Sequence, residues 1–254
     1  ALSSAASDVY KRQGVEILNR DEYEERKSRL DREQLIDGII NNYFDEYRGK
    51  NNEKQSIAIF IGGGSGSGKS TLRKKLVDSG ELQNCLVIDS DILKKIIPEY
   101  SALSEEVPEM AASIVHEESS VMASKLFEKA LEEKINFIFD ATMKNTGKYE
   151  DFFSKLKSNG FQIELIITTV SVETAKSRNR QRFEYLKKSG QPARLVPDNI
   201  VEGSHEKVVE SFEKLKDLAD NWIIIDTEDT SKIVAVKGKI CDEQLYQKFI
   251  GNDN

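Results

Sequence analysis

The fold is decided by the segment IAIFIGGGSGSGKST, residues 57–71. Its apolar start, Ile57–Ile61, is typical of a buried strand, and a helical pattern, Ser70–Asp78, follows the glycines. Between them, Gly63–Ser70 satisfies G-x-x-x-x-G-K-S/T, a P-loop whose backbone N–H groups encircle a phosphate. A Gly/Ser-rich linker is the alternative, but the strand before and the helix after disfavour it. We therefore expect a nucleoside triphosphate to be bound by Gly63, Gly64, Ser65, Gly66, Ser67, Gly68, Lys69, Ser70 and Thr71.

Two side chains of this loop are expected to carry chemistry. Lys69 would reach the β- and γ-phosphates, and the Ser70 hydroxyl would coordinate the Mg²⁺ that accompanies the nucleotide. The N-terminus of the following helix adds a partial positive charge. The loop does not distinguish ATP from GTP as the phosphate donor.

The rest of the chain continues the alternation of strand and helix patterns that α/β folds show. Near-continuous apolar strands are typical of a parallel sheet with both faces covered. The sequence therefore predicts an α/β fold of the P-loop NTPase, kinase-like type, with helices flanking a mainly parallel five-stranded sheet. The predicted strands are Ile57–Ile61, Leu86–Ile88, Phe137–Phe139, Leu165–Val170 and Trp222–Ile225. Helices are predicted near Ser70–Asp78, Ala111–Glu133, Gly147–Asn159, Val172–Lys188 and Asp198–Ala219, and a strand-like Ile233–Val236 and a helix-like Asp242–Phe249 complete the chain.

A helical extension is predicted to precede this domain. Apolar residues between positions 35 and 43 are spaced to fit one helical face, so residues 14–53 are expected to be helical. Residues 54–254 are expected to form the P-loop kinase domain, with a lid around 183–197 where glycine and proline occur. Residues 1–13 contain a stretch, Asp8–Gln13, that resembles a translated sequencing adapter, so we expect them to be artefactual or disordered.

The composition excludes several classes of protein. A net charge of −7 argues against a nucleic-acid binder, which would present a strongly basic face. The chain has 2 cysteines, Cys85 and Cys241, which is neither a disulfide framework nor a metal-ligand cluster. Apolar runs stay short of the roughly 18 residues needed to span a bilayer, and the N-terminal residues lack the layout of a signal peptide. We expect a cytoplasmic protein that binds neither nucleic acid nor membrane.

Carboxylates follow two of the predicted strands. Asp89 and Asp91 come directly after the second strand, and Asp140, two residues before Thr142, comes after the third. Ligands of open α/β sheets bind at the C-terminal ends of the strands. There a carboxylate can hold Mg²⁺ or accept a proton from an attacking hydroxyl. For Asp89 and Asp91, capping of a helix is an equally reasonable role, and composition does not choose between them.

Arginines follow the fourth predicted strand. Arg178 and Arg182 stand four residues apart, which places both guanidinium groups on one helical face, and Arg194 follows on the predicted lid. Positive charge around the γ-phosphate assists phosphoryl transfer, and a lid excludes water. The alternative for each arginine taken singly is a solvated basic helix.

With these pieces in chain order, the sequence resembles the zeta-toxin family of P-loop kinases from about Ser56 to Asp226. Beyond the P-loop, the matching pieces are Val87–Asp91 with Pro98, His116–Ser119, Phe139–Thr142, Arg182–Glu184 and Ala193–Pro197. The resemblance implies an ATP- or GTP-dependent kinase that phosphorylates a hydroxyl of a UDP-activated amino sugar, typically UDP-N-acetylglucosamine. It also implies a toxin that is held inactive by a small helical antitoxin.

The resemblance assigns roles to individual residues. Asp91, seven residues before Pro98, would be the general base, and Arg182 and Arg194 would neutralise the γ-phosphate. Asp89 stays a candidate Mg²⁺ ligand beside Ser70. Substrate contacts are implied for Asp140, Thr142, Glu117, Glu118 and the position of Ser124.

This chain departs from the family pattern at two of these positions. Asp140 stands where the UDP-sugar kinases usually have Glu, and Ser124 where a second Glu is expected. An exposed helical face is the alternative for Glu117 and Glu118, and capping or a core position is the alternative for His116 and His205. These departures leave the phosphate chemistry intact and leave the sugar open.

Two other functions remain possible on the sequence alone. One is a P-loop kinase for another small hydroxyl substrate, such as a nucleoside or a dinucleotide. The other is a non-catalytic regulatory module, which is disfavoured because no Asn-Lys-x-Asp motif for base recognition follows a strand. The N-terminal segment 14–53 is expected to pack as an extension, with inhibition in cis as the alternative.

Overall fold

A computed structural model describes residues 17–26, 29–50, 55–80, 82–108, 110–141, 143, 145–191, 193 and 195–251. The chain divides into two compact units. The unit that we call the P-loop unit consists of Gly49–Val87, Glu133–Arg180 and Val196–Asn254. The other, which we call the helical unit, consists of Ala1–Arg48, Ile88–Glu132 and Gln181–Leu195. The segment 1–13 lies outside the described residues.

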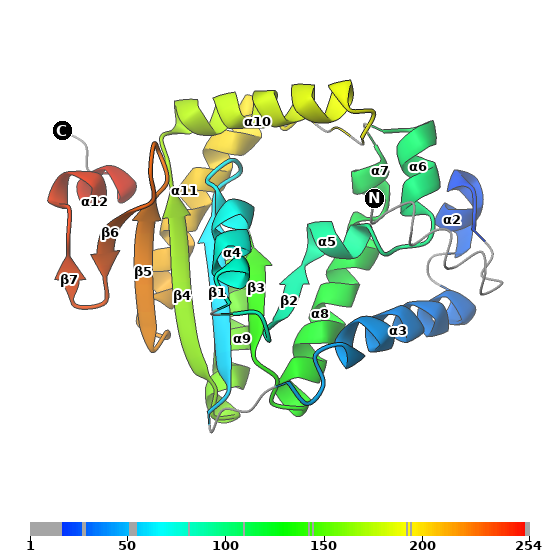
Figure 1. Cartoon of the computed structure of the whole chain (residues 1–254), viewed down its shortest axis with the longest axis horizontal. Helices are drawn as coiled ribbons and strands as arrows, with labels where there is room; N and C mark the ends of the chain where they lie inside the picture. Colours follow the sequence, from blue (N-terminus) through cyan, green and yellow to red (C-terminus); the bar gives the residue numbers. More distant parts are fainter. Residues whose placement is uncertain are drawn as a thin grey trace. The chain divides into compact units, whose positions relative to one another are not determined.

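The sheet runs in the order β2-β3-β1-β4-β5-β6-β7 (Figure 1). Its strands are β1 (Ile57–Gly63), β2 (Leu86–Asp89), β3 (Phe137–Ala141), β4 (Gln162–Thr169), β5 (Asn221–Asp226), β6 (Lys232–Val236) and β7 (Lys239–Ile240). Strand β1 pairs in parallel with β3 and β4, and β4 pairs in parallel with β5. The parallel arrangement places the C-terminal ends of these strands, including the start of the P-loop, at one edge of the sheet.

The predicted α/β, P-loop kinase-like architecture is confirmed, but the predicted number of strands is wrong. The sheet has seven strands rather than five, because β6 pairs antiparallel with β5 and β7 pairs antiparallel with β6. The pattern of β6 is visible in the sequence, whereas β7 has two exposed residues and carries no periodicity. A strand that short is defined by its ladder partner alone.

The P-loop unit also contains helices. These are α4 (Lys69–Asp78), α9 (Thr146–Ser158), α10 (Val172–Lys188, up to Arg180 in this unit), α11 (Asp198–Leu215) and α12 (Glu243–Phe249). Helix α4 lies on one face of the sheet, and α9 and α11 lie together on the other (Figure 1). Between α9 and the sheet, the ring of Phe60 packs 4.8 Å from the ring of Phe153 and 5.6 Å from that of Phe139. This aromatic contact holds β1, and therefore the start of the P-loop, against its neighbours.

The helical unit contains α2 (Arg20–Arg26), α3 (Leu30–Asp45), α5 (Ser90–Lys94), α6 (Tyr100–Glu106), α7 (Ala111–Ile114) and α8 (His116–Glu132). The helix expected over 14–53 is thus two helices in the described residues, and the helix expected over 111–133 is interrupted at Val115, where φ is −90° and ψ is 9°. The sequence pattern did not predict helix α6. Among the described residues, no helix is both long enough and apolar enough to span a bilayer.

Candidate functional site

The P-loop connects β1 to α4 in the P-loop unit, as the motif predicts. Gly66 and Gly68 have φ of 78° and 87°, in the left-handed region that glycine enters without a steric penalty. Gly63 is needed for space, because a Cβ there would overlap the hydroxyls of Ser67 and Thr168. The loop is therefore a tight turn whose glycines serve separate purposes.

Side chains distant in sequence fix the loop from the sides. The buried hydroxyls of Ser67 and Thr168 lie 2.7 Å apart, and the Thr227 hydroxyl donates to the Ser67 carbonyl at 2.9 Å. The Ser65 hydroxyl donates to Oδ1 of the buried Asn179 at 3.0 Å. These partners are more than 100 residues from the loop in sequence, so no local motif could have indicated them.

The reactive residues of the motif lie at the start of α4. The Lys69 ammonium donates to the carbonyls of Gly63 and Gly64 at 2.8 and 3.0 Å, within the loop itself. Ser70 and Thr71 are exposed in the first turn of the helix. Backbone N–H groups in a first turn have no partner within the helix, so they are available to a phosphate group.

The arginines of α10 separate into different roles. Arg178 donates to the hydroxyl of Thr227 at 3.0 Å and to the carbonyl of Glu228 at 2.8 Å. Arg180 forms an exposed ion pair with Asp198. Arg182 is exposed on the same helix, and Arg194 lies outside the described residues. The structure thus gives Arg178 a role in fixing the segment after β5, next to the P-loop.

Asp140 is the penultimate residue of β3 in the P-loop unit and forms an ion pair with Arg73 of α4. Nε of Arg73 donates to Oδ2 of Asp140 at 3.2 Å, and the Asp140 side chain is 6% exposed. Thr142, its predicted companion, lies outside the described residues. The pair ties the end of β3 to the helix that carries the P-loop lysine.

In the helical unit, the two aspartates after β2 take different roles. Asp89 is the N-cap of α5, and its Oδ1 accepts from the backbone N–H of Asp91 at 2.8 Å. The Asp91 side chain is 79% exposed and pairs at 2.8 Å with Lys94, whose side chain is only 8% exposed. The capping role weighed for both residues is thus observed for Asp89. The Asp91 carboxylate, apart from its pair with Lys94, faces solvent.

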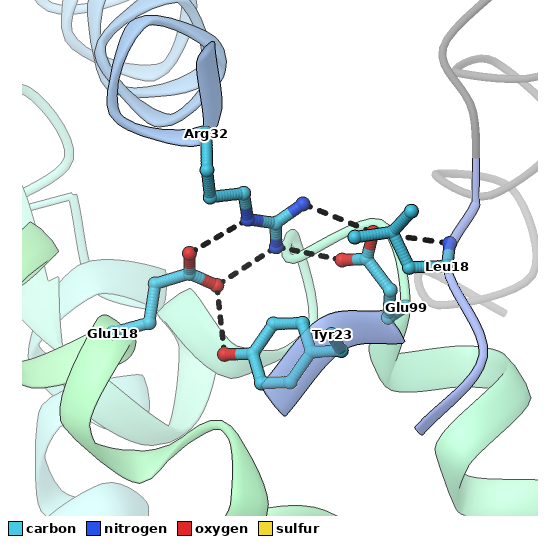
Figure 2. Close-up of polar contacts among 5 residues, drawn as sticks. All are labelled: Leu18, Tyr23, Arg32, Glu99 and Glu118. Carbon is cyan, nitrogen blue, oxygen red and sulfur yellow. Dashed lines mark hydrogen bonds and ion pairs between the residues drawn. The ribbon is translucent and has the colours of Figure 1, made fainter. Parts of the chain in front are cut away.

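Glu118 is held in a buried network within the helical unit (Figure 2). Arg32 of α3 donates to both of its oxygens, at 2.8 and 2.9 Å, and the Tyr23 hydroxyl donates to Oε2 at 3.0 Å. The same guanidinium donates to both oxygens of Glu99, at 2.9 and 2.6 Å. The exposed helical face considered for Glu118 is therefore wrong, whereas Glu117 is exposed.

The network has electrostatic consequences for its members. Burial by itself would lower the pKa of the Arg32 guanidinium, but its bonds to Glu118 and Glu99 raise that pKa above the ordinary value. Burial, together with the nearby charge of Glu118, raises the pKa of the Tyr23 hydroxyl. Both groups therefore stay protonated and act as donors. Ser124, also on α8, donates its hydroxyl to the carbonyl of Ser120 in the preceding turn.

The P-loop and its surroundings correspond to a known protein family. A family model described as "Zeta toxin" matches residues 40–238. The chain belongs to the zeta toxin family. Toxin PezT of Streptococcus pneumoniae serotype 4 is 27% identical over 175 residues, which is 68% of this chain and 68% of that protein.

Solved structures agree with this membership at the level of the fold. A structure from the PezAT chromosomal toxin–antitoxin system of Streptococcus pneumoniae has a TM-score of 0.69 and 19% identity, covering 87% of this chain and 89% of that one. The AvrRxo1-ORF1:AvrRxo1-ORF2 complex with ATP has a TM-score of 0.63 and 17% identity, covering 86% and 70%. The P-loop found here is thus placed in a zeta-toxin-type kinase fold.

As a member of the zeta toxin family, the chain is a nucleotide-dependent phosphotransferase. Within the P-loop unit, the Ser70 hydroxyl at the start of α4 is a hard oxygen donor of the kind that Mg²⁺ prefers. The described residues contain no cluster of three or more His, Cys, Asp or Glu side chains that could bind a metal by themselves.

Proposed function

We propose that this zeta-toxin-family protein transfers the γ-phosphate of ATP or GTP to a hydroxyl of a UDP-activated amino sugar, UDP-N-acetylglucosamine. The observation that carries the transfer is the complete P-loop between β1 and α4, with Lys69 and Ser70 in the first turn of the helix. The sugar nucleotide is supported by the resemblance of the chain, including the piece around Asp91, to the family, although Asp140 departs from the pattern of its UDP-sugar kinases.

In this proposal, Asp91 takes the proton from the attacking hydroxyl, and the exposure of its carboxylate is compatible with that role. Lys69, Arg182 and Arg194 stabilise the charge on the transferred phosphate. Ser70 and Asp89 are the residues proposed to hold a Mg²⁺ ion, which would supply positive charge to the phosphates.

Substrate contacts are proposed for Asp140, Thr142, Glu117 and Ser124. We propose a structural role in place of a substrate contact for Glu118, because both of its oxygens already accept hydrogen bonds from Arg32 or Tyr23. Its bonds would then fix the helix that carries Glu117.

The activity can be tested by product analysis. The full chain is mixed with Mg²⁺, ATP or GTP and a panel of UDP-sugars, nucleosides and dinucleotides, and each acceptor is examined by mass spectrometry. Gain of one phosphate group by UDP-N-acetylglucosamine alone would support the proposal. Gain by a nucleoside or dinucleotide instead would establish the alternative kinase. Consumption of nucleotide without any phosphorylated acceptor would refute the transfer to a small molecule and favour a regulatory module.

The proposed base can be tested with a matched pair of variants. Asp91→Asn should lower kcat by about 10²–10⁴-fold, because a positioned base contributes that much, while nucleotide affinity is retained. Asp45→Asn is the control, since Asp45 is an exposed residue of the same unit paired with Arg48. Transfer at the wild-type rate by Asp91→Asn would remove Asp91 from the mechanism.

We further propose that an antitoxin restrains this protein, because the structurally similar PezAT proteins form a toxin–antitoxin system. The wild-type chain should then inhibit growth when it is expressed alone, and Asp91→Asn should not. Inhibition in cis by residues 14–53 is the alternative. The packing of Arg32 and Tyr23 into the helical unit favours a structural role for that segment. Equal growth with both proteins would contradict the toxin role.

A further inference from the structure

Helix α11 holds the P-loop through two consecutive residues, Ser204 and His205, both within the P-loop unit. The backbone N–H of Ser65 donates to the hydroxyl oxygen of Ser204 at 2.9 Å. Nε2 of His205 lies 3.1 Å from the carbonyl oxygen of Ser65. Because a carbonyl oxygen only accepts, Nε2 is the ring nitrogen that carries the proton.

Ser204 is itself oriented for this contact. Its hydroxyl proton is donated to the carbonyl of Val201 at 2.6 Å, which leaves the oxygen to accept from Ser65. The Ser65 side chain is fixed separately by Asn179, whose own amide donates to the carbonyl of Ala175 at 2.9 Å. The N–H, the carbonyl and the hydroxyl of Ser65 thus all have protein partners.

Gly64 fits the imidazole of His205. Gly64 is absent from the glycines with a left-handed φ, so its backbone conformation does not require glycine. A Cβ on Gly64 would instead overlap the His205 ring, at Cδ2 and Cγ as well as Nε2. The histidine, rather than the turn, therefore explains why position 64 has no side chain.

The electrostatic surroundings keep this imidazole neutral. Burial lowers the pKa of His205, the bond to Ser65 raises it in part, and the positive charge of Lys69 lowers it. Lys69 also donates to the carbonyl of Gly64 at 3.0 Å, one residue before the carbonyl that His205 holds. The catalytic lysine and the histidine thus act on neighbouring peptide groups of one loop.

We propose that His205 is a positioning residue of the nucleotide site, which holds the Gly64–Ser65 backbone in the geometry that receives the triphosphate. The proposal rests on nucleotide binding at the P-loop. A glycine-rich loop without this hold would populate other conformations, and apparent affinity falls by the fraction of molecules that remain competent. Once the nucleotide is bound, its phosphate contacts keep the loop in place, so the effect falls on affinity and KM rather than on kcat.

The test measures binding of Mg²⁺-ATP and Mg²⁺-GTP to the full chain by calorimetry, together with steady-state turnover. His205→Ala should raise Kd and the nucleotide KM about three- to tenfold, the range expected for one net hydrogen bond, with kcat changed less than about twofold. His205→Gln places an amide N–H at a similar reach and should bind within about twofold of wild type. Lys207→Ala, an exposed position of the same helix, is the control and should bind as wild type does.

A double substitution tests the fit between ring and glycine. Gly64→Ala alone should weaken binding at least as much as His205→Ala, because the added Cβ displaces the ring or the loop. In the His205→Ala background the same Gly64→Ala change should cost little more, since the overlap is gone. Additive losses of affinity in the double variant would overturn the proposed fit.

The outcomes separate this inference from the proposed function. A wild-type chain that binds neither nucleotide would refute nucleotide binding itself. Wild-type binding with His205→Ala unchanged, or a loss in kcat alone, would overturn the positioning role only. Equal weakening in His205→Ala and His205→Gln would show that the hydrogen bond to Ser65 does not matter. If His205→Ala fails to fold, as judged by circular dichroism, His205→Gln and Gly64→Ala decide. Binding close to wild type by His205→Gln together with weakened binding by Gly64→Ala supports the positioning role, and wild-type binding by Gly64→Ala overturns it.

Discussion

Replacing Arg32 by alanine should destabilise the helical unit severely. The Arg32 side chain is 3% exposed and lies between the carboxylates of Glu99 and Glu118, which are 0% and 9% exposed (Figure 2). Four hydrogen bonds from one guanidinium satisfy these two carboxylates. Removal of the guanidinium leaves two buried negative charges facing each other. Of the hydrogen bonds between side chains in Figure 2, only the one from the Tyr23 hydroxyl to Glu118 then remains.

The magnitude follows from the cost of breaking a buried ion pair on one side. Removing one partner of such a pair costs about 3–5 kcal/mol, because the remaining charge stays desolvated without compensation. In a domain of this size, 1 kcal/mol corresponds to roughly 2–4 °C, so we expect a fall in Tm of about 6–20 °C. The contact of the guanidinium with the ring of Tyr23, 5.2 Å from the centroid, is lost as well.

Thermal and urea unfolding of wild type, Arg32→Ala and Arg29→Ala measure this effect. Arg29 is the matched control, because its side chain is 60% exposed and its pair with Asp31 spans 3.5 Å, so its loss should change stability by less than about 0.5 kcal/mol. Combining Arg32→Met with Glu99→Gln and Glu118→Gln should recover much of the stability, because no buried charge remains unpaired. A loss below about 1 kcal/mol for Arg32→Ala would refute the reasoning.

Four further outcomes are expected. Gly66→Ala should abolish tight nucleotide binding, since φ is 78° and a Cβ would lie 2.6 Å from the carbonyl oxygen of Ala175; calorimetry with Mg²⁺-ATP checks this. Lys69→Ala should reduce turnover by at least about 10²-fold, which steady-state kinetics would show, because its ammonium supplies charge to the β- and γ-phosphates. Asn136→Ala should lower the free energy of unfolding by about 1–3 kcal/mol, as urea unfolding would show. The reason is that the backbone N–H of Ile57, which donates to Oδ1 of Asn136 at 2.7 Å, loses its partner. The pKa of His205 is depressed in the folded chain, so the unfolded chain binds a proton at this residue more readily. The contribution of neutral His205 to stability is therefore complete above about pH 6.5 and is lost as pH falls below that value. His205→Gln should lack this part of the acid sensitivity when unfolding is followed from about pH 8 to pH 5.

Local pattern predicted the elements that hold the phosphate chemistry. The strand before Gly63 and the helix from Lys69 follow from apolar runs and glycine spacing, which act over neighbouring residues. The sequence also indicates the capping of α5 by Asp89 as one of two roles, because capping depends on residues two positions apart. Predictions failed where pairing with a neighbouring strand defines an element, as for β7, and where a local break interrupts a helical pattern, as at Val115.

The sequence by itself determined the P-loop, the alternation of strands and helices and the family to which the chain belongs, because each is recorded in short patterns along the chain. Only the tertiary structure decided that Glu118 belongs to a buried network with Arg32, 86 residues away, and that Arg178 fixes the segment after β5. The same holds for His205, which lies against the loop from 140 residues further along the chain. Such pairings arise when the packing of whole helices excludes water from both partners, and no periodicity within either helix records them.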